Sequence, residues 1–330
     1  MRAVEVKEFG GPEVLAVVDA PEPVAAAGEV LIRVATADVG FLDLLLRSGA
    51  GKEYFPVHPP FVPGSVVAGT VITAGPGVDT AWIGRRVATP TASSGVGGGS
   101  PTGGYAELAL AKADTLVEVP EEVNLVQAAA LVSDGRTAIA VADRANIQPG
   151  DRVLITAAAG GLGTLLIQLA RAAGAEVIAA ARGEAKLALA QRLGAQHVVD
   201  YSEPGWVERV RALSGGGVQV VLDGAGGAIG TATLAATARG GVILGYGNAA
   251  GGFAPFDPES VAAQGVTVVS LFDIADPAAD WKSMQEQALR EVAAGRLEVV
   301  IGQTFPLDDA VAAHEAIAAR AAIGRTILTV

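Results

Sequence analysis

A glycine-rich stretch in the middle of the chain has the residue types of a phosphate-binding turn. Residues 157–163 follow the apolar run Val153–Ile155 and precede a segment rich in Leu and Ala at helical spacing, Thr164–Ala173. This order predicts a strand, a glycine turn and a helix. Without a Cβ at the turn, the backbone can approach a pyrophosphate, whose charge meets the N–H groups and positive dipole end of the helix. The stretch therefore predicts a dinucleotide site.

The residue after the next strand indicates which dinucleotide binds. A G-x-G-x-x-G fingerprint would place glycines at Ala158, Gly160 and Gly163, so the match is imperfect. About 20 positions beyond the last glycine, where NAD sites usually carry Asp or Glu, stands Arg182. A guanidinium offers a planar fork that suits a 2′-phosphate, and Lys186 would supply a second positive charge. The pattern favours NADP over NAD; the alternative is that both are ordinary solvated residues.

The elements that must position this site alternate along the chain. Apolar strands are expected over Val177–Ala180, His197–Val199, Val218–Leu222, Gly241–Leu244 and Val266–Leu271. Helices are expected over Lys186–Leu193, Trp206–Leu213, Thr231–Ala238 and Trp281–Ala294. Strands alternating with helices predict an α/β fold with a doubly wound parallel sheet, whose ligand lies at the carboxyl ends of the strands. The loops expected there are 157–163, 182–184, 200–203, 223–227 and 245–252.

The remainder of the chain is organised differently. Short β-rich segments before Pro120 predict a small barrel-like domain. Further helices are expected over Leu125–Val132 and Thr137–Ala145. The C-terminal part is expected to form a strand over Leu297–Ile301, a helix over Asp308–Ala319 capped by Asp308, and a last strand over Thr326–Val330.

Composition excludes several classes of function. The length of 330 residues suggests two domains, and 51% hydrophobic with 18% charged residues is typical of a well-buried globular protein. The absence of cysteine excludes a disulfide framework, a thiolate nucleophile and cysteine-based zinc or iron–sulfur sites. A net charge of −12 argues against general nucleic-acid binding. The N-terminus has no apolar segment typical of a signal peptide, and glycines interrupt the uncharged run Val153–Ala170, so we expect a soluble, cytoplasmic protein.

Motifs along nearly the whole chain resemble the medium-chain dehydrogenase/reductase superfamily, specifically its zinc-independent quinone oxidoreductase (ζ-crystallin-like) branch. They are Gly10–Leu15, Gly28–Leu31, Arg47–Gly49, Pro63–Gly64, Asp134–Ala138, Ala157–Gly163, Leu193–Ala195 and Gly245–Asn248. The resemblance implies a GroES-like catalytic domain over 1–122, completed by 297–330, and a Rossmann NADP-binding domain over 123–296.

The resemblance also implies roles for particular residues. Gly160, Gly161, Leu162 and Gly163 would meet the pyrophosphate. The nicotinamide half would lie near Thr137 and the turn formed by Tyr246, Gly247 and Asn248. The 2′-phosphate would be held by Arg182, Lys186 and Tyr201. We therefore expect NADPH as the cofactor.

A catalytic zinc is not expected. Zinc-dependent relatives use a Cys and a His–Glu pair, and the corresponding positions here are Gly40, Ser65 and Val66. The three histidines are scattered without ligand spacing. The chain also departs from the quinone oxidoreductase pattern, because Gly40 replaces a common Asn and is followed by the bulky Phe41 and Leu42.

Without a metal, the simplest chemistry is direct hydride transfer from NADPH to a conjugated carbonyl such as a quinone. Candidate substrate-cleft residues are Phe41, Asp43 and Tyr54, with Tyr246 as a further aromatic face. For Phe41, Tyr54 and Tyr246 core packing is the alternative, and Asp43 near a helix start is more often structural. Residues 93–104 form either a flap over a cleft or a surface connector.

Two other functions use the same cofactor. A 2-alkenal or enone (enoyl) reductase would transfer the same hydride to an acyclic acceptor. A non-catalytic NADPH-binding protein, crystallin-like or redox-sensing, would bind the cofactor without turnover. The run Val266–Leu271 corresponds to an edge strand that pairs across a homodimer in relatives, whereas a covering loop or helix is the alternative. We expect no nucleic-acid or membrane partner.

Overall fold

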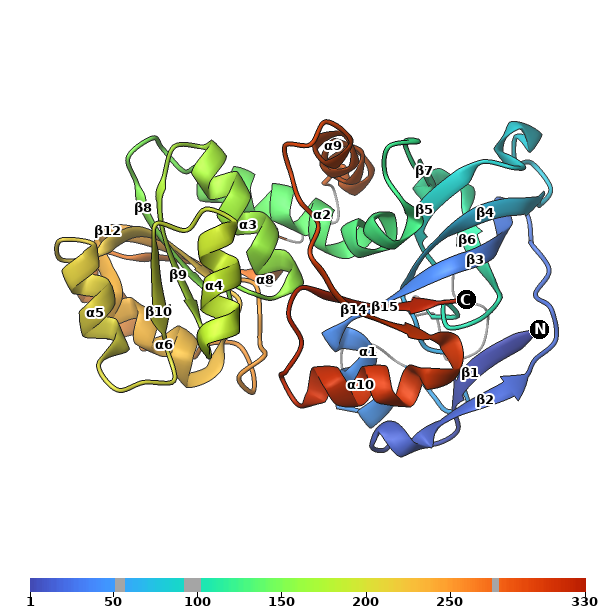
Figure 1. The fold of residues 1–330 in the computed structure, drawn as a ribbon, viewed down its shortest axis with the longest axis horizontal. Helices are drawn as coiled ribbons and strands as arrows, with labels where there is room; N and C mark the ends of the chain where they lie inside the picture. The colour runs from blue at the N-terminus through green and yellow to red at the C-terminus, as the bar shows by residue number, and fades with distance from the viewer. Residues whose placement is uncertain (51–56, 92–101, 275–278) are drawn as a thin grey trace. The chain divides into compact units, whose positions relative to one another are not determined.

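The computed structural model of the chain describes residues 1–50, 57–91, 102–274 and 279–330 (Figure 1). The chain forms two compact units, the first made of Met1–Ser133 and Gln285–Val330 and the second of Asp134–Met284. Helix α2 (Leu125–Ala145) and helix α9 (Trp281–Ala293) each cross from one unit into the other. The domain boundaries after residues 122 and 296 stay a prediction.

The second unit is built on a parallel sheet of six strands in the order β10-β9-β8-β11-β12-β13. Its strands are β8 (Arg152–Thr156), β9 (Glu176–Ala181), β10 (His197–Asp200), β11 (Val218–Asp223), β12 (Thr237–Gly245) and β13 (Thr267–Ser270). Figure 1 labels β8, β9, β10 and β12 of this sheet. From the central pair β8 and β11 the chain winds outward in both directions. Right-handed crossovers therefore place helices on opposite faces of the sheet. This doubly wound arrangement is the one that the alternating sequence pattern predicts.

The helices of this unit are α3 (Gly161–Ala172), α4 (Glu184–Arg192), α5 (Trp206–Leu213), α6 (Gly227–Ala236), α7 (Pro258–Gln264) and α8 (Leu271–Ile274). The strand residues Val153, Leu154 and Ile155 are fully buried, as expected for a sheet covered on both faces. The helix expected over Thr231–Ala238 is misplaced. Helix α6 begins already at Gly227, and it ends at Ala236 because Thr237 pairs with Val218 and so opens strand β12.

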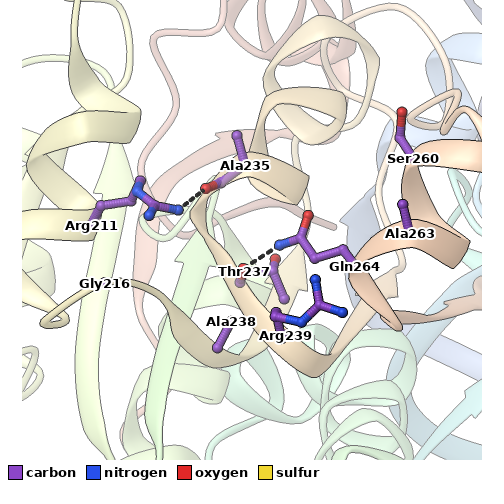
Figure 2. A pocket seen from close by; sticks show the side chains of 9 residues that line it. All are labelled: Arg211, Gly216, Ala235, Thr237, Ala238, Arg239, Ser260, Ala263 and Gln264. Atoms are coloured by element: carbon purple, nitrogen blue, oxygen red, sulfur yellow. Dashed lines mark hydrogen bonds between the residues drawn. The ribbon is translucent and has the colours of Figure 1, made fainter.

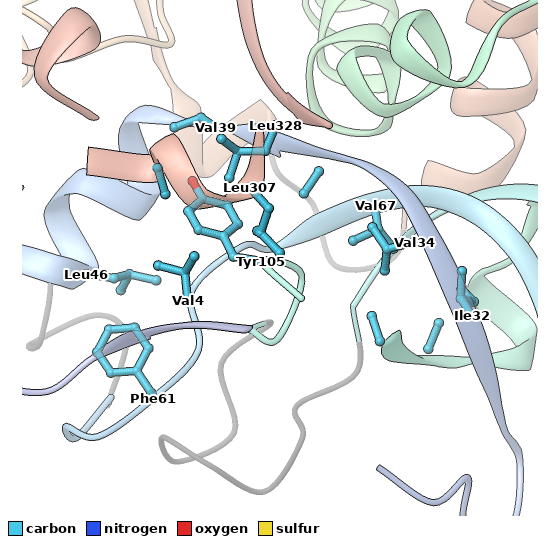
Figure 3. Packing of buried hydrophobic residues seen from close by; sticks show 14 of the residues in the cluster. Val4, Ile32, Val34, Val39, Leu46, Phe61, Val67, Tyr105, Leu307 and Leu328 are labelled. Carbon is cyan, nitrogen blue, oxygen red and sulfur yellow. The ribbon is translucent and has the colours of Figure 1, made fainter. Parts of the chain in front are cut away.

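The first unit contains a two-stranded sheet and a larger mixed sheet of order β14-β15-β3-β4-β5-β7, in which β6 also pairs with β3. Its strands are β1 (Arg2–Val6), β2 (Leu15–Asp19), β3 (Glu29–Val39), β4 (Val66–Ala74), β5 (Arg86–Pro90), β6 (Leu108–Lys112), β7 (Val117–Glu118), β14 (Ile301–Pro306) and β15 (Arg325–Thr329). Buried residues from both chain segments pack together, including Tyr105, Leu307 and Leu328 (Figure 3). The C-terminal segment thus completes this unit.

An ion pair fixes where the C-terminal strand joins the rest of the first unit. Strand β15 lies antiparallel to β3, with Thr326 opposite Val39. Beside this pairing, Arg325 donates from Nε to Asp38 Oδ1 over 2.8 Å. The two side chains are 15% and 3% exposed, and burial lowers the pKa of Arg325 to about 10. Strand β3 therefore carries a buried carboxylate that Arg325 of the C-terminal segment neutralises.

Helices of the first unit differ from the sequence expectations. Helix α1 (Phe41–Ser48) has no predicted range, although a helix start near Asp43 was expected, and α2 is one helix where two were expected. The strand expected over Leu297–Ile301 is wrong, because pairing with β15 begins only at Ile301. Asp308 is not a helix cap. It lies in a 3₁₀ turn before α10 (Ala310–Ala318) and instead forms a 2.9 Å ion pair with Arg2. Short 3₁₀ helices are Pro12–Val14, Thr80–Trp82, Ala113–Thr115 and Leu307–Asp309.

Helix α2 is long and apolar enough to cross a membrane by length and composition alone. In this structure 61% of its most apolar window is buried within the protein. Burial of this kind is typical of a core helix, which satisfies its apolar surface against neighbouring elements.

Candidate dinucleotide-binding site

The expected ligand loops come together at one edge of the parallel sheet. Strands β8 and β11 are neighbours, and the chain leaves them in opposite directions, toward β9 on one side and β12 on the other. At such a switch point the loops diverge and leave a crevice outside the carboxyl ends of the strands. The turn after β8 and the loops after β11 and β12 therefore border one site.

The turn after β8 leads directly into the amino end of α3. Gly160 is the N-cap and provides no side-chain hydrogen bond, so the first N–H groups of the helix face outward. A Cβ at Gly163 would lie 2.7 Å from the Ala157 carbonyl oxygen and 2.9 Å from the Ala158 Cα, so the helix can pack this closely only with glycine. Gly161 and Leu162 form the intervening first turn and are half-buried. Free N–H donors at a positive dipole end fit a pyrophosphate.

A buried carboxylate joins the ends of β8 and β11. Asp223 is fully buried and accepts hydrogen bonds from Thr156 Oγ1 at 2.5 Å, from the Ala225 N–H at 3.1 Å and from the Gly226 N–H at 3.2 Å. Burial raises the pKa of Asp223, and these hydrogen bonds oppose the rise. This pair was not predicted from the sequence. A polar residue closing each of two neighbouring buried strands is the signal that would have found it.

The turn after β12 packs on the loop after β11. The N–H groups of Tyr246 and Gly247 donate to the Asp223 carbonyl oxygen at 2.9 and 3.2 Å. A Cβ at Gly247 would lie 2.0 Å from the Gly224 carbonyl oxygen, so the two backbones touch there. Asn248 accepts through its carbonyl oxygen from the N–H of Gly252 at 3.1 Å. The two loops therefore form one body and position the Tyr246–Asn248 turn.

The Tyr246 hydroxyl is a buried donor at this edge of the sheet. Its ring lies against Gly224, where a Cβ would meet the hydroxyl at 2.8 Å. Among the described residues the hydroxyl has no hydrogen-bond partner. Burial raises the pKa of Tyr246, and the charges of Asp223 and Asp134 raise it further. The hydroxyl thus stays protonated and can donate to a bound group.

Helix α2 contributes Thr137 beside this turn. Asp134 lies one helical turn earlier, and its charge raises the pKa of Tyr246. This part of α2 therefore lies near the turn after β12. Burial raises the pKa of Asp134 to about 7. Thr137 is half-buried. Its neighbour Arg136 places its guanidinium 5.5 Å from the ring centroid of Trp281. The structure thus brings Thr137 and Tyr246 to the same region.

Arg182, Lys186 and Tyr201 gather at the carboxyl ends of β9 and β10. Arg182 is exposed directly after β9, and Lys186 is half-buried in the first turns of α4. Burial lowers the pKa of Lys186, and the positive charge of Arg182 lowers it further, so the two cations are close. The Tyr201 N–H donates to the Ala181 carbonyl oxygen at 3.3 Å. Two adjacent cations at this position suit an additional phosphate.

The substrate-cleft candidates lie in the first unit. Phe41 is 40% exposed at the start of α1. Asp43 is buried and accepts from the N–H groups of Gly40 at 2.8 Å and Gly64 at 3.1 Å. Burial raises the pKa of Asp43 to about 6, although these N–H donors oppose the rise. The Asp43 carboxylate thus connects the backbone at Gly40 with the backbone at Gly64. Tyr54 lies outside the described residues, as does most of the predicted flap; only its residues 102–104 are described.

A buried hydrogen-bond chain that the sequence did not reveal leads away from Asp43. The Tyr105 hydroxyl donates to its carboxylate. His314 contacts that hydroxyl through Nε2 at 3.2 Å and Arg47 through Nδ1 at 3.1 Å. Because a guanidinium can only donate, Nδ1 accepts and Nε2 carries the proton toward Tyr105. His314 lies in α10, so the C-terminal segment completes this series of hydrogen bonds.

We expect His314 to make stability depend on pH. Burial, together with the charge of Arg47, lowers the pKa of His314 from 6.5 to about 3. The ring therefore takes up a proton on unfolding, and its contribution to the unfolding free energy is present above pH 6.5 and lost as the pH falls. Chemical denaturation from pH 4 to 5.5 should show that His314→Gln removes about 1.4 kcal/mol per pH unit of slope.

A matched control for this prediction is His197→Gln. That ring is half-exposed and lies 3.0 Å from Glu176. Asp43 cannot produce the same slope, because its raised pKa acts in the opposite direction, with stability lost as the pH rises through about 6. An unchanged slope in His314→Gln would show that the ring is not buried in its neutral form.

Comparisons with known proteins agree with this architecture. The family model described as the alcohol dehydrogenase GroES-like domain matches residues 26–121, and the one described as zinc-binding dehydrogenase matches residues 161–293. A 2-haloacrylate reductase of Burkholderia sp is 33% identical, covering 99% of this chain and 98% of its own.

Several solved structures match the full length of the chain, and two of them are quinone oxidoreductases with different identities to it. A mycobacterial quinone oxidoreductase is 36% identical with a TM-score of 0.83, covering 100% of both chains. The Escherichia coli quinone oxidoreductase, solved in complex with NADPH, is 28% identical with a TM-score of 0.89, also covering 100% of both. The predicted pairing of a GroES-like domain with a Rossmann domain is thus confirmed, and the chain belongs to the medium-chain dehydrogenase/reductase superfamily, in its quinone oxidoreductase branch.

Proposed function

We propose that this oxidoreductase transfers a hydride from NADPH to a quinone. The observation that carries the cofactor assignment is the pair of adjacent cations, Arg182 and Lys186, at the end of β9. An NAD site usually places an acid there, to accept from the ribose 2′-hydroxyl. The NADPH complex of the E. coli relative supports the same choice.

Different groups of residues would bind different parts of the cofactor. The α3 amino end, from Gly160 to Gly163, would hold the pyrophosphate through backbone N–H groups. Arg182, Lys186 and Tyr201 would hold the 2′-phosphate. Thr137 and the Tyr246–Asn248 turn would bound the nicotinamide half.

When bound, NADPH supplies a hydride to an electron-poor conjugated carbonyl, and one proton from solvent completes the reduction. The protein then needs to align the two rings and keep water out. The buried, protonated Tyr246 hydroxyl offers a hydrogen bond on this side of the site. Phe41, exposed at the start of α1, offers an aromatic face for a flat acceptor.

A second candidate function is an NADPH-dependent 2-alkenal or enone reductase. The similarity to the 2-haloacrylate reductase favours it, because that acceptor is also an activated carbon–carbon double bond. A non-catalytic NADPH-binding protein is the third candidate, and turnover separates it from the first two.

We further propose that catalysis is zinc-independent. The positions of the expected ligands hold Gly40, Ser65 and Val66, and the sequence has no cysteine. Among the described residues, no group of three His, Asp or Glu side chains is arranged to hold a metal. A cytoplasmic location stays a proposal that rests on the sequence features given above.

A homodimer through β13 is also proposed. This strand is the last in its sheet, and Val268 on it is 38% exposed. Phe272 follows it, 64% exposed, in edge contact with Phe253 at 5.8 Å between ring centroids. A second copy pairing with this edge would satisfy its backbone groups and cover the apolar side chains. Sedimentation of the purified chain at the mass of one copy would refute it.

The main proposal is tested by following the nicotinamide absorbance of the purified protein with a simple quinone, a fused-ring quinone and a linear enal, with NADPH and NADH in parallel. We expect quinone-dependent oxidation of NADPH and little oxidation of NADH. Faster turnover of the enal would favour the second function. Binding of NADPH without turnover of any acceptor would favour the third.

A further inference from the structure

The second unit has a pocket at the edge of its sheet opposite the glycine turn. Its volume is about 510 Å³. Thr237, which opens β12, and Gly216, which shortly precedes β11, place the pocket at the amino ends of these strands. Figure 2 shows the residues that line it: Arg211, Gly216, Ala235, Thr237, Ala238, Arg239, Ser260, Ala263 and Gln264. None of the proposed cofactor residues is among them.

An irregularity in β12 presents Arg239 to this pocket. Thr237 pairs with Val218, but the next paired residue is Val242, opposite Val220, so extra residues bulge out of the ladder. Gly240 takes a φ of +74° there, which suits glycine. Bulges of this kind re-aim side chains. Arg239 is exposed, and among the described residues no hydrogen bond or ion pair engages its guanidinium.

Arg211 supplies a second guanidinium from α5. Its Nη1 donates to the Ala235 carbonyl oxygen at 2.8 Å, which satisfies one end of helix α6 and holds the side chain in place (Figure 2). A guanidinium has five N–H donors, so most of its capacity stays available. Gln264 is likewise fixed, because its Nε2 donates to the Leu234 carbonyl oxygen at 3.1 Å. A second bond, from Nε2 to the Thr237 carbonyl oxygen, engages the other N–H of Gln264, so the donors that stay available in the pocket wall are those of the arginines.

The charge of the pocket is not balanced locally. Two arginines line it and no Asp or Glu does, in a chain whose net charge is −12. Figure 2 shows the two side chains coming from different elements, α5 and β12. A planar carboxylate is matched by one guanidinium, whereas a tetrahedral phosphate presents oxygens to donors from several directions. Two positive charges also match a phosphate monoester, which carries close to two negative charges at neutral pH.

The remaining lining indicates what accompanies the phosphate. Ala235, Ala238 and Ala263 are small and apolar, and they leave space beyond the two guanidinium groups. We propose that this pocket binds a small organic phosphate, with Arg239 and Arg211 holding the phosphate group. The site is separate from the cofactor site and does not depend on the proposed function.

Calorimetric titration with inorganic phosphate, at constant ionic strength set with chloride, tests the phosphate subsite. The titration uses an Arg182→Gln background, which removes one of the two cations at the end of β9, and it requires no bound NADPH. We expect one saturable site. Arg239→Gln should weaken phosphate binding at least tenfold, and Arg239→Lys, which keeps the charge, by less.

A matched control is Arg85→Gln, whose guanidinium is 55% exposed and already pairs with Glu118 at 2.8 Å. It should leave phosphate binding unchanged. Because Arg239 is exposed, its variants should keep the melting temperature of the parent. Non-saturable binding, or equal binding by the Arg239→Gln and Arg85→Gln variants, would overturn the assignment.

Discussion

Gly247→Ala should lower the unfolding free energy by about 1–3 kcal/mol and weaken NADPH binding at least tenfold. A Cβ at this position would lie 2.0 Å from the carbonyl oxygen of Gly224 and 2.5 Å from its carbonyl carbon. These are backbone atoms, so the clash cannot be relieved by turning a side chain. The loops after β11 and β12 would have to separate, and the Tyr246–Asn248 turn would move with them. Denaturant titration and NADPH fluorescence titration measure the two effects.

The control for this prediction stands two residues away. A Cβ at Gly245 would have no atom within 4 Å, and its backbone is not left-handed. Gly245→Ala should therefore change the unfolding free energy by less than about 1 kcal/mol. Equal losses in both variants would show that the contact between Gly224 and Gly247 does not hold the two loops together.

Arg182→Ala should weaken NADPH binding about ten- to hundredfold, the range expected for losing hydrogen bonds to a charged group. NADH lacks the 2′-phosphate, so its affinity should stay nearly the same and serves as the internal control. Arg182→Lys should fall between, because an ammonium keeps the charge but loses the planar fork. Equal losses for NADPH and NADH would refute the role of Arg182 in 2′-phosphate binding.

The same variant should act on Lys186. Because the charge of Arg182 contributes to the lowered pKa of Lys186, its removal should raise that pKa.

In the wild type, the preference for NADPH over NADH should decline as the pH falls below about 6, where a phosphate monoester loses its second charge. Titrating both dinucleotides across this range measures the decline.

The parts of the fold that the sequence predicts well are those with local causes. The run Val153–Ile155 and the helix over Trp206–Leu213 are where the pattern expects them, because apolar periodicity reflects burial of one element. Predictions fail where a distant partner decides the structure. Thr237 looks like the end of a helix, yet pairing with Val218 makes it the start of a strand.

The candidate site divides in the same way. The glycine turn and Arg182 are recognisable because their spacing along the chain is short and follows from strand and helix geometry. The hydrogen bond from Thr156 to Asp223 and the contact of His314 with Tyr105 join residues 67 and 209 positions apart. Such contacts depend on which strands become neighbours, and the sequence pattern does not contain that information.

The pairing of Asp38 with Arg325 has a consequence for folding during synthesis, because the two segments of the first unit are synthesised at different times. These partners are 287 residues apart, so β3 is made long before β15 exists to cover its edge. The whole Asp134–Met284 unit is synthesised in the interval and is continuous, so it can fold first. Meanwhile the uncovered edge carries an ionised Asp38, and a charge on an open strand discourages pairing with other nascent chains. The Asp38 carboxylate thus disfavours pairing of β3 with other chains until β15 has been synthesised and Arg325 pairs with it.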